Sequence, residues 1–78
     1  MIEIYGTADC GYCKKAIQLC VDNGLDYNYI DIDYVSDYDQ LISKLGNFRT
    51  VPQIVLDNVL VGGYDDLVEA IRENKIGL

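Results

Sequence analysis

The sequence predicts a single α/β domain whose elements follow one another in the order βαβαββα. The chain has only 78 residues, half of them hydrophobic, so it has room for one small core. Short runs with a two-residue hydrophobic period alternate with stretches in which apolar residues recur every three or four positions. Turn-forming residues separate these segments, and no linker, internal repeat or low-complexity tract interrupts them. We therefore expect residues 1–78 to form one domain.

The first half of the chain is predicted to be a βαβ unit. Residues 2–5 alternate between apolar and polar or aromatic side chains in a strand that ends at Gly6, and we expect this strand to be central. Residues 10–23 carry apolar side chains at helical spacing, and Gly24 is a suitable C-terminal stop. A second strand is expected over residues 27–33, parallel to the first because a right-handed helical crossover joins them.

The second half contains two more predicted helices. Residues 36–46 fit a helix of three turns, because Ser36 and Asp39 resemble a capping box and apolar residues line one face. The final helix is expected to begin with Asp65 as its cap, followed by an amphipathic stretch.

A β-hairpin is predicted between these two helices. Residues 53–56 and 59–61 are short apolar runs separated by Asp57 and Asn58. Such a pair suits a two-residue hairpin turn, so the two runs are expected to be antiparallel strands.

Charge and composition exclude several classes of function. Thirteen acidic residues against six basic ones give a net charge of -7, which disfavours binding to nucleic acid or to an anionic membrane surface. The chain has no histidine, so serine-hydrolase and zinc-hydrolase chemistry lack their usual groups. No apolar run approaches the roughly 20 residues of a membrane helix, and no signal peptide is recognisable, so we expect a cytoplasmic protein.

The three cysteines point to reactive thiols in a reducing compartment, because a small secreted domain would usually carry an even number. Cys10 and Cys13 are three residues apart where a strand and loop lead into a helix. Unpaired amides in the first helical turn would stabilise a thiolate and lower the pKa of Cys10, which makes Cys10 the expected nucleophile. Cys13 lies one turn inward, on the apolar face, and is the expected resolving thiol.

Structural alternatives exist for the same cysteines. They could be ordinary buried residues or part of a zinc knuckle, but zinc requires four ligands and the chain offers only Cys20 as a third thiol. Cys20 lies on the apolar stripe of the helix, so we interpret it as a small core residue without a redox role.

Three motifs, taken together and in this order, resemble those of the glutaredoxin family. They are the cysteine pair after the first strand, the segment Thr50-Val51-Pro52, and the run from Gly62 to Asp66 before the last helix. The likeness covers nearly the whole chain. It implies a thioredoxin-like fold, with a four-stranded mixed sheet flanked by three helices.

The resemblance also implies a site for glutathione. A cis bond between Val51 and Pro52 would turn the Val51 backbone toward Cys10, where it can pair with an extended thiol substrate. The start of the last helix would bind the γ-glutamyl carboxylate, and Asp66 would take the ammonium group. The expected glutathione-binding residues are Tyr12, Arg49, Thr50, Val51, Pro52, Gly63, Tyr64, Asp65 and Asp66.

Several of these residues have a second, purely structural interpretation. Pro52 could be an ordinary trans proline at the start of a strand. Asp65 and Asp66 could both be helix caps, which we favour for Asp65. Arg49 is the basic residue best placed by the resemblance to meet the glycyl carboxylate, although a solvated surface arginine is nearly as good an interpretation. Tyr12 would form a wall of the groove beside the sulfur.

The sequence departs from the common family pattern near the nucleophile. Gly11 stands where a proline is frequent, and Thr7 stands where many members carry a lysine. Asp9 adds a negative charge beside the thiol or caps the helix, and Lys14 and Lys15 can offset that charge.

The resemblance implies a glutathione-dependent thiol–disulfide oxidoreductase, which we expect to be a monomer. Cys10 would attack a protein disulfide or a glutathionylated thiol, Cys13 would resolve the mixed disulfide, and glutathione would reduce the pair again. Ribonucleotide reductase is a physiological substrate suggested by the family, and no metal is expected in this interpretation.

Two alternatives stay open. One is a dimeric module in which Cys10 from two protomers and two glutathiones hold a [2Fe–2S] cluster. It is motivated by Gly11, because some family members without the proline assemble such clusters. The other is a redoxin reduced by thioredoxin reductase, against which the run from Gly62 to Asp66 weighs.

Overall fold

The computed structural model describes residues 1–73, and its elements follow in the predicted order. The strands are β1 (Ile2–Gly6), β2 (Tyr27–Asp31), β3 (Gln53–Leu56) and β4 (Val59–Gly62). The helices are α1 (Gly11–Asp22), α2 (Tyr38–Leu45) and α3 (Tyr64–Arg72), with a short 3₁₀ helix, η1 (Ile32–Tyr34), after β2.

The four strands form one mixed sheet in the order β2-β1-β3-β4. Strand β1 is central, as predicted: it pairs in parallel with β2 and antiparallel with β3, which in turn pairs antiparallel with β4. The fold class predicted from the sequence, a thioredoxin-like α/β fold, is confirmed.

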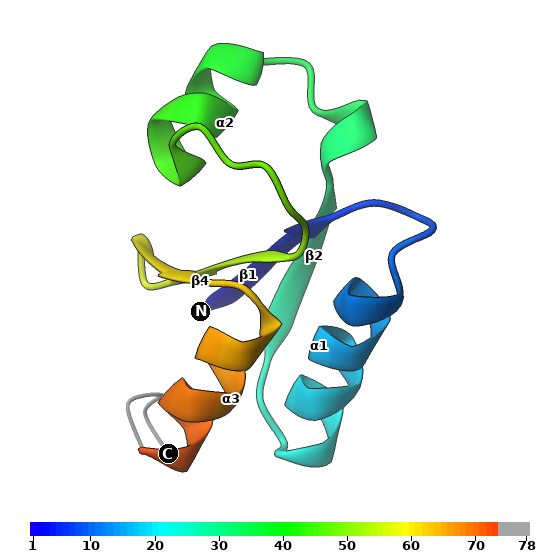
Figure 1. Cartoon of the computed structure of the whole chain (residues 1–78), viewed down its shortest axis with the longest axis vertical. Helices are drawn as coiled ribbons and strands as arrows, with labels where there is room; N and C mark the ends of the chain where they lie inside the picture. The colour runs from blue at the N-terminus through cyan, green and yellow to red at the C-terminus, as the bar shows by residue number, and fades with distance from the viewer. Residues whose placement is uncertain (74–78) are drawn as a thin grey trace.

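Helices α1 and α3 cover one face of the sheet, and α2 covers the other (Figure 1). The alternation of side chains along the strands sets this division. Ile4 and Ile54 lie opposite each other on β1 and β3 and are buried with the residues of α1 and α3. Tyr5 and Val55, the next residue along each strand, are buried against α2. Two hydrophobic clusters therefore share one central sheet.

An ion pair joins α2 to the central strand. Lys44 Nζ lies 2.9 Å from Glu3 Oε1 and 5.9 Å from the centre of the Tyr5 ring. Hydrogen bonds to Glu3 and Tyr5 raise the pKa of Lys44, so its ammonium is charged throughout the physiological range.

The predicted second strand is too long. It ends at Asp31, because its partner β1 ends at Gly6 and the parallel register ends with the pair Gly6–Asp31. Beyond this point the chain forms η1, where the Asp31 carboxylate accepts a hydrogen bond from the Asp33 amide at 3.0 Å. Ile32 therefore lies in a 3₁₀ turn, not in the sheet.

The predicted capping box of the second helix is also wrong. Asp37 is the N-cap, and its carboxylate accepts a hydrogen bond from the Gln40 amide at 3.1 Å. An aspartate caps a helix end as well as a serine does and adds a favourable charge, so the helix begins one residue after Asp37 and spans eight residues. It ends, as predicted, before Gly46, whose φ is 70°.

The hairpin turn agrees with its prediction. Asp57 and Asn58 both have positive φ, 48° and 69°, as a two-residue turn of type I′ requires. They join β3 and β4 in the antiparallel pair expected from the sequence.

Asp65 does not cap α3, contrary to the prediction. Gly63 is the N-cap, and the Asp66 carboxylate accepts a hydrogen bond from the Gly63 amide at 3.0 Å. Because the helix begins at Tyr64, Asp66 is at the third helical position, from which an acidic side chain reaches back to the N-cap amide. Within residues 1–73 we find no helix with the length and apolarity needed to cross a membrane.

We predict that Leu67→Ala lowers the free energy of unfolding by about 2–5 kcal/mol, because it empties a fully buried site under α3. Urea denaturation of the oxidised protein measures the loss. Leu60→Ala is the matched control, since Leu60 is 42% exposed and its loss should be clearly smaller. Equal losses in the two variants would contradict this account of the core.

Candidate active site

The sulfur of Cys10 caps the N-terminus of α1. Cys10 is the N-cap residue, with extended φ and ψ of -109° and 111°, and its Sγ accepts a hydrogen bond from the Cys13 amide at 3.1 Å. An N–H group that points at a sulfur stabilises that sulfur as an anion. Asp9, which the sequence offered as a possible cap, is exposed and does not cap the helix.

Cys10 and Cys13 are joined by a disulfide, with their Cα atoms 5.1 Å apart. The two sulfurs differ in access, because Cys10 is 9% exposed and Cys13 only 1%. The pair therefore has an outer and an inner sulfur, as expected from the position of Cys13 one turn inside the helix.

The loop before β3 brings backbone oxygen atoms close to the outer sulfur. Cys10 Sγ lies 3.7 Å from the carbonyl oxygen of Val51, and the Val51–Pro52 peptide bond is cis, as the family resemblance implies. Residues 41 positions apart in the chain thus meet at the start of α1.

Eight of the nine residues expected to bind glutathione line one hollow of about 220 Å³ beside this contact. They come from the start of α1, from the loop before β3 and from the start of α3. The lining residues are Tyr12, Thr50, Val51, Pro52, Gly63, Tyr64, Asp65 and Asp66. Arg49, the ninth residue, is exposed and does not line the hollow.

Aromatic rings form one wall of this hollow. Tyr12 is 58% exposed, and its ring lies 5.8 Å from that of Tyr64 in a tilted arrangement. Lys15 Nζ lies 4.9 Å from the centre of the Tyr12 ring, within the range of a cation–π interaction. These contacts link the start of α1 to the start of α3 across the hollow.

The start of α3 offers groups of both signs. The amides of the first helical turn carry a partial positive charge that suits a carboxylate. The Asp66 carboxylate is held beside them, because its Oδ2 accepts a hydrogen bond from the Gly63 amide. Its Oδ1 can then bind a cationic group. One small molecule with both an α-carboxylate and an α-ammonium would match this pair of charges.

Cys20 belongs to the core and not to this site. It is fully buried between α1 and the sheet, forms no disulfide, and burial raises the pKa of its thiol. Across the described part of the chain, no three His, Cys, Asp or Glu side chains are grouped so as to hold a metal ion.

A close approach on the inner side of the disulfide was not expected from the sequence. A Cβ atom placed on Gly6 would lie within 2.5 Å of both Cys13 Sγ and the Tyr29 hydroxyl oxygen. That hydroxyl donates a hydrogen bond to the Thr7 carbonyl oxygen at 2.7 Å. In the sequence, Gly6 is recognisable only as the end of a strand, and no local pattern indicates that three elements converge there.

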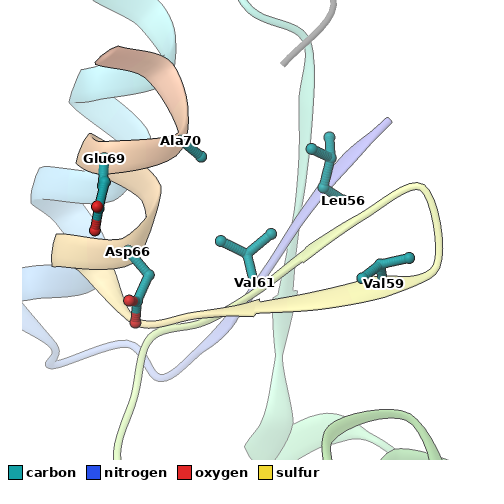
Figure 2. A pocket seen from close by; sticks show the side chains of 6 residues that line it. All are labelled: Leu56, Val59, Val61, Asp66, Glu69 and Ala70. Atoms are coloured by element: carbon teal, nitrogen blue, oxygen red, sulfur yellow. The ribbon is translucent and has the colours of Figure 1, made fainter. Parts of the chain in front are cut away.

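A larger hollow, of about 400 Å³, lies between the β3–β4 hairpin and α3 (Figure 2). Its apolar lining comes from Leu56, Val59 and Val61 of the two strands and from Ala70 of α3, and the carboxylates of Asp66 and Glu69 lie along α3. Asp66 is shared with the smaller hollow. Of the two, it is the smaller hollow that is lined by Val51, whose carbonyl oxygen lies 3.7 Å from Cys10 Sγ, so we assign the redox chemistry to that hollow.

Comparison with known proteins identifies the family. A family model described as Glutaredoxin matches residues 2–61. The chain belongs to the glutaredoxin family. It is 38% identical to Glutaredoxin 1 of Rickettsia prowazekii over 77 residues, which cover 96% of this chain and 81% of that protein. It is 36% identical to the glutaredoxin of Pseudomonas aeruginosa over a match that covers 96% of this chain and 89% of that protein.

Solved structures agree with this assignment. Reduced Escherichia coli glutaredoxin superposes with a TM-score of 0.78 at 32% identity, and 95% of each chain is covered. The buckwheat glutaredoxin–glutathione complex superposes with a TM-score of 0.77 at 29% identity, and the match covers 96% of this chain and 71% of the buckwheat chain. The chain is accordingly a thiol–disulfide oxidoreductase with a dithiol formed by Cys10 and Cys13.

We predict that the three thiols of the reduced protein react with iodoacetamide in a fixed order. Cys10 reacts first, and the midpoint of its rate against pH lies below the ordinary thiol value of about 8.5, because the helix amides favour its thiolate. Cys20 reacts last, because its burial and raised pKa keep it a protonated thiol at neutral pH. Peptide mapping by mass spectrometry after timed quenching measures all three rates.

Unfolding in urea is the control for the alkylation order, since all three thiols should then react at similar rates. A Cys10 midpoint at or above about 8.5, or a folded protein in which Cys20 reacts as fast as Cys10, would contradict the assignment.

Proposed function

We propose that the protein is a glutathione-dependent oxidoreductase that reduces protein disulfides and glutathione mixed disulfides. The observation that supports this most strongly is the hollow that joins the Cys10 contact to the start of α3. The hollow lies beside Cys10, and it is lined by the Thr50–Pro52 backbone segment and by the start of α3 with the Asp66 carboxylate beside it.

The chemical groups of glutathione match these features. Its cysteinyl sulfur would meet Cys10, and its extended backbone would pair with the Val51 backbone as an added strand does. Its γ-glutamyl carboxylate would accept hydrogen bonds from the amides at the start of α3, and its ammonium would form an ion pair with Asp66. The complex of buckwheat glutaredoxin with glutathione is consistent with such a site in a relative of 29% identity.

Reduction of a protein disulfide would need both cysteines. The Cys10 thiolate attacks one sulfur of the substrate, a Cys10–substrate disulfide forms, and the other substrate sulfur leaves as a thiolate that takes a proton from water. Cys13 then loses its proton and attacks Cys10 Sγ, which releases the second substrate thiol and forms the Cys10–Cys13 disulfide. Two glutathione molecules reduce that disulfide and become glutathione disulfide, so the two electrons are accounted for.

Removal of glutathione from a modified protein would need Cys10 alone. The Cys10 thiolate attacks the glutathione sulfur and releases the protein thiol. A second glutathione thiolate attacks the same glutathione sulfur, which gives glutathione disulfide and restores the Cys10 thiolate. The hollow supports this route because, in this proposal, it would hold the glutathione portion of the substrate and not the protein portion.

We further propose a cytoplasmic monomer, with ribonucleotide reductase among its protein substrates. The odd number of cysteines favours a thiol enzyme of a reducing compartment. The family resemblance supports the choice of substrate.

We predict that Cys10→Ser abolishes activity with both classes of substrate, because the two cysteines that are left are buried and cannot reach a sulfur of the substrate. Cys13→Ser keeps activity on glutathionylated peptides and loses reduction of protein disulfides, since only reduction of a protein disulfide needs an inner thiol. A coupled assay with glutathione, glutathione reductase and NADPH measures both. Turnover by Cys10→Ser equal to that of the unmodified protein would refute the proposal.

We also predict that Asp66→Asn raises the KM for glutathione about tenfold, the size expected when a hydrogen bond to a charged group loses its charge. The side-chain oxygen of the asparagine can still accept the hydrogen bond from the Gly63 backbone amide, so the start of α3 keeps its structure. Glu69→Gln removes the same charge one turn later, outside the smaller hollow, and should leave KM unchanged. A similar KM in all three proteins would place glutathione elsewhere.

A further inference from the structure

The inner sulfur of the pair lies next to a tyrosine hydroxyl. Cys13 Sγ and the Tyr29 hydroxyl oxygen are both within 2.5 Å of the position that a Cβ atom on Gly6 would occupy. Two atoms that both lie within 2.5 Å of one point are at most about 5 Å apart. Only glycine at this position lets the two side chains approach each other across the end of β1.

Cys13 has little access to water. It is 1% exposed, and the buried side chains of residues 1–73 include none that is polar or charged. The titratable side chains packed on the same side of the sheet are Tyr27 and Tyr29 of β2, Tyr64 of α3 and Cys20 of α1, with Cys10 at the helix start. Asp31 at the end of β2 acts on Tyr29 electrostatically. Lys14 and Lys15 follow Cys13 on α1 and are exposed.

This environment opposes the step that Cys13 must perform. To attack a mixed disulfide on Cys10, the Cys13 thiol must ionise, and burial away from water disfavours the thiolate. The amide of Cys13 points at Cys10 Sγ and so stabilises the outer sulfur, not the inner one. A donor on the inner side would offset part of the cost.

We propose that Tyr29 is a positioning residue for the dithiol reaction, whose hydroxyl turns from the Thr7 carbonyl to the Cys13 sulfur and stabilises its thiolate by a hydrogen bond. A hydroxyl hydrogen rotates about the C–O bond, so the same group can exchange one nearby acceptor for another. Burial, followed by the charge of Asp31, raises the pKa of Tyr29, so the hydroxyl stays protonated and remains a donor at neutral pH.

The proton balance of the step is simple. Cys13 gives its proton to water, its thiolate accepts the Tyr29 hydrogen bond, and the sulfur then forms a bond to Cys10 Sγ while the substrate thiolate leaves. In the reverse direction the same hydrogen bond stabilises Cys13 as the leaving group when a thiolate attacks Cys10. Tyr29 itself gains and loses no proton.

The inference goes beyond the proposed use of glutathione, because it concerns only the exchange between Cys13 and Cys10. Its test therefore contains no glutathione. The reduced protein is labelled with ¹³C at the cysteine Cβ atoms, and the Cys13 signal is followed by NMR against pH. In Tyr29→Phe we expect the inflection of the Cys13 signal to move up by about one pH unit. At any fixed pH below both inflections, this corresponds to about tenfold less Cys13 thiolate.

Two further proteins distinguish a hydrogen bond from a packing effect. Tyr27→Phe makes the same change two residues earlier on the same face of β2 and should leave the Cys13 inflection in place. Substitution of Tyr29 by 3-fluorotyrosine, a stronger donor of similar shape, should lower the inflection. An unchanged inflection in Tyr29→Phe, or an equal rise in Tyr27→Phe, overturns the proposal.

A kinetic measurement tests the same step. Reduced protein is mixed with insulin, the reaction is quenched with acid, and the Cys10 mixed disulfide and the Cys10–Cys13 disulfide are separated by mass. In Tyr29→Phe the first attack should keep its rate and the closing step should slow about tenfold at neutral pH, so that the mixed disulfide accumulates. A loss confined to the first attack, or none at all, would overturn the role of Tyr29.

Discussion

The hydrogen bond from the Cys13 amide to the Cys10 sulfur is the contact on which the rest of the site depends. It makes the outer sulfur the cap of α1, so the reactive atom and the first turn of the helix are positioned together. Strand β1 brings the chain to that point from the centre of the sheet, and α1 packs back across the same strand. A change that disturbs the helix start therefore alters reactivity and folding at once.

Much of the fold could be predicted because its signals lie inside each element. The alternation in β1, the helical spacing in α1 and the Asp57-Asn58 pair each indicate one local structure, and the structure has all three. The errors arise where an element ends for a reason that lies elsewhere. Ile32 leaves the sheet because β1 has already ended, which no property of Ile32 itself reveals.

The candidate site divides in the same way. The family resemblance carried by the cysteine pair and the two short motifs implied eight of the residues that line the hollow. Each motif is contiguous in the chain, so the resemblance could be recognised without knowing how the fold brings the three segments together. The assignment of capping to Asp65 rather than Asp66 failed because it depends on the residue at which α3 begins, a difference of one position. The approach of Gly6, Tyr29 and Cys13 could not be predicted, because it joins three elements through contacts that leave no periodic signal.

The small exposed fraction of Cys10 has a consequence for the shape of its partners. Cys10 is only 9% exposed, and the Val51 carbonyl oxygen lies 3.7 Å from its sulfur, so a target sulfur has to reach into a recess to meet it. A disulfide recessed in a rigid concave surface cannot come within bonding distance, whereas one that protrudes on a loop or at a chain end can. Whether the target disulfide protrudes from its protein, in addition to its redox potential, then decides which proteins this small enzyme can reduce.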